Sequence, residues 1–163
     1  MTTTDWPKSG ECRCGATTIE VAGPPFMTAA CHCEGCQRMS GSAFALTAMF
    51  RPDLFRVTEG DPIIGGARHS DIHHYFCPDC MTWMFSRMPM APDFVNVRPT
   101  LFDDTAWFRP FIETVTAEKL AWAETPAPHS YAGFPDPANF PGLVADYAAW
   151  AGQGGAQTAS LRS

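Results

Sequence analysis

The chain has 163 residues, of which 45% are hydrophobic, and its 17 acidic and 11 basic residues give a net charge of −6. This composition predicts a globular protein with its own core, and the acidic balance argues against a nucleic-acid-binding protein, which needs a basic surface. No apolar run approaches the roughly 20 residues of a membrane-spanning helix. The first ten residues lack the charged and then apolar pattern of a secretory signal, so we expect a cytoplasmic location and no membrane partner.

Short segments rich in β-branched and aromatic residues recur along most of the chain. Their composition and spacing predict strands at residues 16–21, 26–30, 42–50, 54–58, 72–76, 82–86, 94–98 and 111–116. Segment 42–50 is also compatible with a short helix, and residues 143–151 predict one short helix. The 15 prolines and 13 glycines, spread between these runs, favour an all-β domain.

The cysteines are the most informative residues of the sequence. There are seven, in three groups: Cys12 with Cys14, Cys31 with Cys33 and Cys36, and Cys77 with Cys80. In a reducing compartment, clustered cysteines indicate metal or redox chemistry and not disulfides. Zinc fits this pattern because soft thiolates select it and because it undergoes no redox change.

The first and third groups together offer the four ligands of a closed tetrahedral zinc site. Such a site would fasten an N-terminal strand to a hairpin with Cys77-Pro78-Asp79-Cys80 at its tip, so residues 10–80 must fold together. We therefore expect a single zinc-binding β domain at residues 9–151. It would follow an N-terminal lead-in at residues 1–8 and precede a flexible, small and polar tail at residues 152–163.

The middle group has more than one interpretation. Cys31, Cys33 and Cys36 can hold a zinc ion whose fourth position stays free for water or substrate, as in a catalytic site. Alternatively, a histidine closes the site and makes it structural, and the candidates are His32, His69, His73 and His74. A redox-active Cys-x-x-Cys pair is a further alternative, although the chain lacks the βαβ setting of such motifs.

The complete cysteine pattern resembles that of the glutathione-dependent formaldehyde-activating enzyme family. The matching segments are Gly10–Gly15, Cys31–Gly41 and Cys77–Cys80, and the resemblance spans about residues 9–115. It implies a mainly-β fold of the β-tent type, in which small antiparallel sheets lean together over the metal, with at most one or two short helices. It also implies a structural zinc on Cys12, Cys14, Cys77 and Cys80 and a catalytic zinc on Cys31, Cys33 and Cys36.

The activity implied by the resemblance is that of a carbon–sulfur lyase that forms or cleaves S-hydroxymethylglutathione. The partners would be a small thiol such as glutathione and an aldehyde, and a homodimer is left open. Arg38, just after the middle group, can pair with a glutathione carboxylate or lie in solvent. The alternative function is a zinc-stabilised binding scaffold without catalysis, because fold alone does not decide function.

Overall fold

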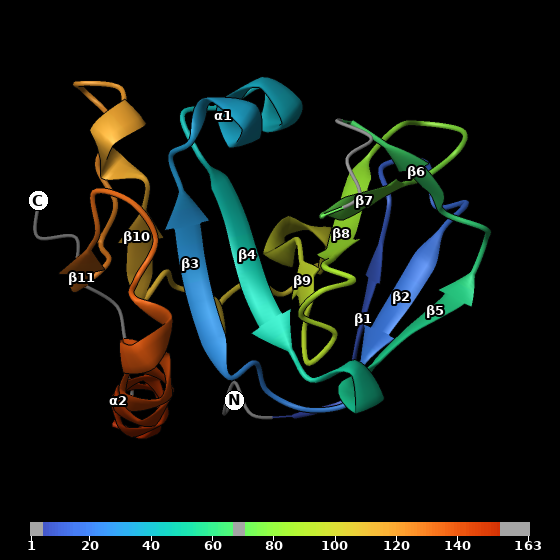
Figure 1. Cartoon of the computed structure of the whole chain (residues 1–163). Helices are drawn as coiled ribbons and strands as arrows, with labels where there is room; N and C mark the ends of the chain where they lie inside the picture. Colours follow the sequence, from blue (N-terminus) through green and yellow to red (C-terminus); the bar gives the residue numbers. More distant parts are fainter. Residues whose placement is uncertain (1–4, 67–70, 154–163) are drawn as a thin grey trace, which may run out of the picture.

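The computed structural model describes residues 5–66 and 71–153. Within them the chain forms two β-sheets and two α-helices, which confirms the expected mainly-β class (Figure 1). The smaller sheet has the strand order β1 (Lys8–Glu11), β2 (Thr18–Val21) and β5 (Phe55–Glu59). The larger sheet has the order β11 (His129–Ser130), β10 (Ile112–Thr114), β3 (Met27–Cys31), β4 (Ala45–Phe50), β9 (Val95–Val97), β8 (Trp83–Arg87), β7 (His73–Phe76) and β6 (Ile63–Gly65).

Most strand pairs of both sheets are antiparallel, as expected, but those of β10 are not. β10 runs parallel to β3 on one side and to β11 on the other. A parallel pair needs a long connection, and the chain between Cys31 and Ile112 provides one by passing through β4 to β9 first. The larger sheet is therefore a mixed sheet.

Each of the eight segments predicted to be a strand contains an observed strand, and segment 42–50 is a strand rather than a helix. The helix predicted at residues 143–151 is α2 (Phe140–Gly152). Three short strands, β1, β6 and β11, and the helix α1 (Glu34–Ser40) were not predicted. Of the predicted lead-in and tail, residues 1–4 and 154–163 lie outside the described residues.

The main core lies between the two sheets. Ile19 and Val21 of β2 face Phe50 of β4 and Phe85 of β8, and all four side chains are buried in one hydrophobic cluster. Strand β2 shows the alternation that predicts a half-buried strand, since Ile19 and Val21 are buried while the residues between and before them are not. Packing of the smaller sheet on the β4–β8 part of the larger one brings the β1–β2 loop close to the β7–β8 turn.

A second core lies under α2. Met27 and Ala29 of β3 and Ile112 of β10 pack against Leu143 and Tyr147 of this helix. The helix thus covers the β3 and β10 end of the larger sheet, as Figure 1 shows. Strand β3 is buried along nearly its whole length because it has strands on both sides and packed side chains over its face.

Helix α1 connects β3 to β4 at one edge of the fold (Figure 1). One N–H group of its first turn is capped by a sulfur atom, since the backbone N–H of Cys36 donates to Sγ of Cys33 over 3.3 Å. The helix ends at Gly41, whose φ of 60° lies in the left-handed region that glycine adopts at little cost. The middle cysteine group therefore lies on a strand end and a helix start. None of the described helices is both long enough and apolar enough to cross a membrane.

Candidate metal centres

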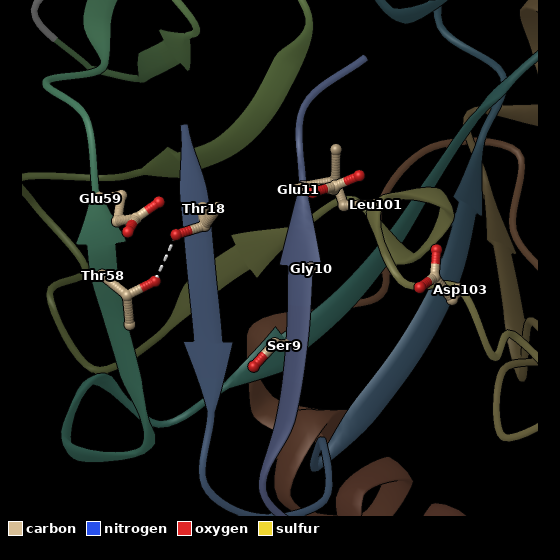
Figure 2. Close-up of a pocket in the computed structure, with 8 residues that line it drawn as sticks. All are labelled: Ser9, Gly10, Glu11, Thr18, Thr58, Glu59, Leu101 and Asp103. Carbon is tan, nitrogen blue, oxygen red and sulfur yellow. Dashed lines mark hydrogen bonds between the residues drawn. The ribbon is translucent and has the colours of Figure 1, made fainter. Parts of the chain in front are cut away.

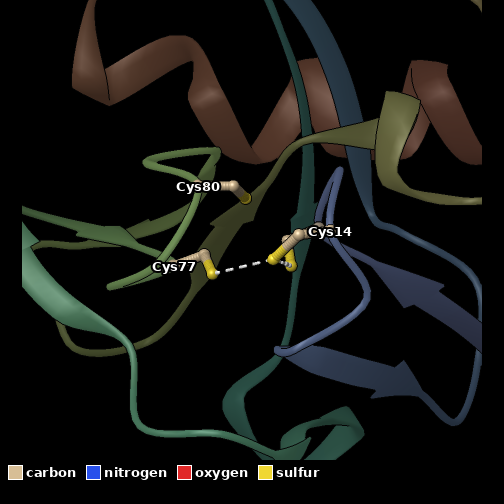
Figure 3. Close-up of side chains that lie close together, drawn as sticks. Cys14, Cys77 and Cys80 are labelled. Atoms are coloured by element: carbon tan, nitrogen blue, oxygen red, sulfur yellow. Dashed lines mark hydrogen bonds between the residues drawn. The ribbon is translucent and has the colours of Figure 1, made fainter.

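The first and third cysteine groups form one cluster in space. Cys12 and Cys14 lie in the loop between β1 and β2, and Cys77 and Cys80 lie in the turn between β7 and β8. The four sulfur atoms are all within 4.8 Å of one another. Figure 3 shows the side chains of Cys14, Cys77 and Cys80 pointing toward one another from these two segments. The cluster joins the smaller sheet to the larger one.

Local hydrogen bonds aim these sulfur atoms inward. The backbone N–H of Thr17 donates to Sγ of Cys12 over 3.3 Å, and Sγ of Cys80 lies 3.1 Å from Oγ1 of Thr82. The turn that carries Cys77 and Cys80 closes through Met81, whose N–H donates to the carbonyl of Cys77. Met81 has a φ of 58°, a strained value for a side chain of its kind, so the turn is held in an uncommon conformation.

The spacing of these sulfur atoms fits a zinc ion. A tetrahedral site with Zn–S bonds of about 2.3 Å places its sulfur atoms about 3.8 Å apart. The Sγ atoms of Cys12 and Cys14 are 3.5 Å apart, and those of Cys14 and Cys77 are 3.8 Å apart. Four thiols at these separations can hold one metal ion with little rearrangement.

The middle group forms a second, separate cluster of three. Sγ atoms of Cys31, at the end of β3, Cys33, at the start of α1, and Cys36, in the first turn of α1, lie within 4.8 Å of one another. All three residues are partly exposed. This trio, as we call Cys31, Cys33 and Cys36 below, can also hold a metal ion.

Hydrogen bonds inside the trio separate the pKa values of its thiols. The pKa of Cys31 is lowered to about 5, chiefly because Cys36 hydrogen-bonds to its thiolate, while burial acts in the opposite direction. The pKa of Cys36 is raised by that same hydrogen bond and by burial, and burial raises the pKa of Cys33. Cys31 is therefore the thiol of the trio that ionises most readily, and a bound cation would displace the remaining protons.

The structure gives no support to a histidine as fourth ligand of the trio. Among residues 5–66 and 71–153, no His, Asp or Glu joins the three sulfur atoms to make a larger group. His32 is fully buried, and its Nε2 lies 3.0 Å from Oε2 of Glu113. His74 is occupied by a hydrogen bond to Ser86, and His73 is not part of the group. The fourth candidate, His69, lies outside the described residues.

Glu113 of β10, the strand next to the β3 end, is the acceptor at the centre of a polar cluster. Besides His32, it accepts hydrogen bonds from Thr125 over 2.8 Å and from Lys119 over 3.4 Å. Glu118, the residue before Lys119, forms two hydrogen bonds with α1. Its Oε2 accepts the backbone N–H of Glu34, and its carbonyl oxygen accepts a hydrogen bond from the side chain of Gln37. The segment after β10 therefore fixes the strand and the helix that carry the three thiols.

Arg38 lies on the outer face of α1 beside a cavity. Its side chain is 78% exposed and forms an ion pair of 2.7 Å with Glu34, one helical turn earlier. The cavity has a volume of about 490 Å³ and is lined by Gln37, Arg38, Gly41, Ser42, Ala43, Leu120 and Trp122. Leu120 and Trp122 belong to a part of the chain for which the sequence suggested no role. They provide the apolar wall of this cavity.

Arg98, the residue directly after β9, is a buried cation for which the sequence predicted no role. Its Nη2 donates to Oγ1 of Thr47 over 2.8 Å, and its guanidinium lies 4.1 Å from the centre of the Trp83 ring. The strand pattern contains a sign of it, because Asn96 and Arg98 alternate with Val95 and Val97, which puts two polar residues on one face. Burial lowers the pKa of Arg98, and the negative charges of Cys36 and Cys31 act in the opposite direction.

A further cavity, of about 360 Å³, lies at the smaller sheet (Figure 2). It is lined by Ser9, Gly10, Glu11, Thr18, Thr58, Glu59, Leu101 and Asp103. Its side chains are mainly polar or acidic and none is a cysteine or histidine. The chemistry of the thiols is therefore not located in this cavity.

Comparison with known proteins identifies a family for most of the chain. The family model described as glutathione-dependent formaldehyde-activating enzyme matches residues 7–118. A crystal structure of a Rhodobacter sphaeroides protein is similar, with 27% sequence identity, 58% of this chain and 87% of that chain covered, and a TM-score of 0.46. No curated protein matches this sequence.

Proposed function

Because the chain belongs to the glutathione-dependent formaldehyde-activating enzyme family, we propose that it is a carbon–sulfur lyase that forms or cleaves a thiol–aldehyde adduct of the S-hydroxymethylglutathione type. The observation that supports this proposal is the trio, three partly exposed residues whose sulfur atoms lie together without a fourth protein ligand among the described residues. A protein that uses zinc only to hold its fold needs no more than the four-cysteine cluster. The three additional thiols favour chemistry.

The reaction makes one bond and moves one proton. Addition of a thiol to formaldehyde forms a carbon–sulfur bond while the carbon–oxygen double bond becomes a single bond, and the thiol proton passes to the aldehyde oxygen. Cleavage is the reverse. A zinc ion held by Cys31, Cys33 and Cys36 would lower the pKa of the incoming thiol below its ordinary value of about 8.5, so that the thiol reacts as a thiolate. The four-cysteine cluster would hold a second zinc ion with a structural role.

The residues of the chain position the thiols and the substrate. Cys33 is fixed as the cap of α1, and Cys31 is fixed by the pairing of β3 with β4 and β10. The cavity beside α1 would take the body of the thiol substrate against Leu120 and Trp122. Arg38, at the same cavity, would pair with a substrate carboxylate in exchange for Glu34.

The proposal is tested by following the exchange of the adduct by NMR. The adduct of glutathione and formaldehyde forms without a catalyst, so its exchange rate and not its amount is the relevant quantity. We expect the zinc-loaded protein to accelerate this exchange and to contain two zinc ions per chain, of which mild chelation removes one. A protein with both sites loaded and no effect on the exchange rate would contradict the proposal and favour the scaffold function.

A further inference from the structure

Arg98 is held in the interior by two contacts of its guanidinium group. The residue is 9% exposed. Its guanidinium is fixed on one side by the hydrogen bond to Thr47 and on the other by the face of the Trp83 ring, 4.1 Å away. These contacts keep the side chain in one place, so its charge acts at a defined position in the fold.

The positive charge of Arg98 lacks a carboxylate partner within the described part of the chain. No ion pair among these residues includes Arg98, and its buried Nε has no hydrogen-bond acceptor. Burial lowers the pKa of Arg98 to about 10, so the guanidinium is still charged at neutral pH. An unpaired charge in the interior is costly, and a nearby negative charge is needed to offset that cost.

Strand register places Cys31, the first member of the trio, on the same sheet face as this charge. Cys31 of β3 pairs with Ala45 of β4, and Thr47 follows two residues later, so the three side chains share one face. Thr47 lies about 7 Å along β4 from Ala45, and it is Thr47 that accepts the hydrogen bond from Arg98. The nearby His74 adds no competing charge at neutral pH, because burial and the charge of Arg98 lower its pKa.

We propose that Arg98 is the buried counter-charge of the trio, and that it stabilises the metal-bound, fully deprotonated form of Cys31, Cys33 and Cys36. The inference rests on the proposed function only in that the trio holds a divalent metal ion. Three thiolates and one divalent cation carry a net charge of −1, and a substrate thiolate would make it −2. Arg98 offsets part of this charge and thereby favours a thiolate over water as the fourth ligand.

The structure separates this role from that of Arg38. Arg38 is 78% exposed and already paired with Glu34, so solvent screens its charge. Arg98 is buried, and its charge acts through protein in place of water, which strengthens its effect on the trio. Arg98 is thus a positioning residue that acts through the sulfur atoms and is not required to touch the substrate.

The test measures the zinc affinity of the trio in the purified full chain with no substrate present, by competition with a chromophoric chelator. For Arg98→Met we expect the trio to bind zinc at least about tenfold more weakly, while the four-cysteine cluster keeps its zinc. Arg98→Lys, which retains the charge, should restore most of the affinity. Arg51→Met, which removes an exposed arginine paired with Asp53, should leave it unchanged.

The outcomes distinguish this inference from the proposed function. Equal zinc affinity of the wild type and Arg98→Met overturns the inference, whatever the catalytic activity. Tenfold weaker binding in Arg98→Met supports it, even if the wild type fails to accelerate adduct exchange. If Arg98→Met loses the zinc of the four-cysteine cluster and so its fold, Arg98→Gln, which can still donate to Thr47, replaces it with the same expected loss. A wild-type chain that binds no second metal ion overturns both proposals.

Discussion

Nε2 of His32 donates to Oε2 of Glu113 over 3.0 Å, and this contact ties the strand end that carries Cys31 to the neighbouring strand β10. His32 stands between two cysteines of the trio in sequence, yet its ring is fully buried and engaged by a carboxylate. The histidine therefore stabilises the position of the β3 end through β10 and does not act as a metal ligand in this structure. Its position suggests that rigidity of the β3 end matters to the geometry of the three thiols.

Replacement of Glu113 tests this support. Glu113→Gln removes the charge that accepts hydrogen bonds from His32, Thr125 and Lys119. We expect it to lower the free energy of unfolding by about 1–3 kcal/mol, because buried donors lose a charged acceptor. Urea unfolding of the zinc-loaded protein measures the change. Glu59→Gln, at an exposed position, is the control, and equal losses in both variants would contradict the assigned role.

The effect of Glu113→Gln should depend on pH. Burial raises the pKa of Glu113, but hydrogen bonds from Thr125, Ser130 and His32 outweigh burial and leave the pKa below its ordinary value of 4.5. A carboxyl group whose pKa is lower in the folded state stabilises the fold above its unfolded pKa and loses that effect as the pH falls through its folded pKa. The stability difference between wild type and variant should be constant near neutral pH and shrink below pH 4.5. A difference that grows with acidification would contradict this assignment.

The four-cysteine cluster should be essential for folding. Cys80→Ser removes one of its ligands, and structural zinc on four thiolates supplies on the order of 10–16 kcal/mol of apparent binding energy, which is comparable with the whole stability of a domain. We expect this variant to lose its zinc at the cluster and most of its β-sheet circular dichroism. A folded Cys80→Ser protein that keeps this metal ion would show that the cluster is not the structural site.

Arg38 should affect the binding of glutathione and little else. Its exposed ion pair predicts a modest contribution, so Arg38→Ala should raise KM for glutathione about two- to fivefold. With 2-mercaptoethanol, a thiol without carboxylates, KM should not change. Arg51→Ala, another exposed and paired arginine, serves as the control. An equal rise of KM for both thiols would assign Arg38 a role other than carboxylate binding.

Most of the strands and the two cysteine clusters could be predicted because their signals are local. β-branched runs such as Thr18–Val21 and the spacing of the cysteines are visible without knowledge of distant residues. Helix α1 was missed because Cys33 is a rare capping residue and the helix has only seven residues. The parallel pairing of β10 also could not be foreseen, because it depends on where the chain returns after β9.

The hydrogen-bond partners of buried polar residues could not be predicted from the sequence either. Its position next to cysteines makes His32 a candidate metal ligand in the sequence. Only the fold shows that its Nε2 is hydrogen-bonded to Glu113, 81 residues later. The sequence places Arg98 at the end of a predicted strand. Its position relative to Cys31 depends on the order of β3, β4 and β9 in the sheet, which the sequence does not show. Leu120 and Trp122 line the cavity because their segment, which has no regular secondary structure, lies beside α1. The sequence of that segment has no periodic pattern that would predict this position.

The central claim is that the four-cysteine cluster is structural and the trio is reactive. The rate of adduct exchange in Cys36→Ser, followed by NMR together with the zinc content of the variant, tests this claim most directly. We predict that this variant keeps its circular dichroism and one tightly held zinc ion while the exchange rate falls to that of the uncatalysed reaction. An exchange rate equal to that of the wild type would contradict the assignment of Cys31, Cys33 and Cys36 as the reactive centre.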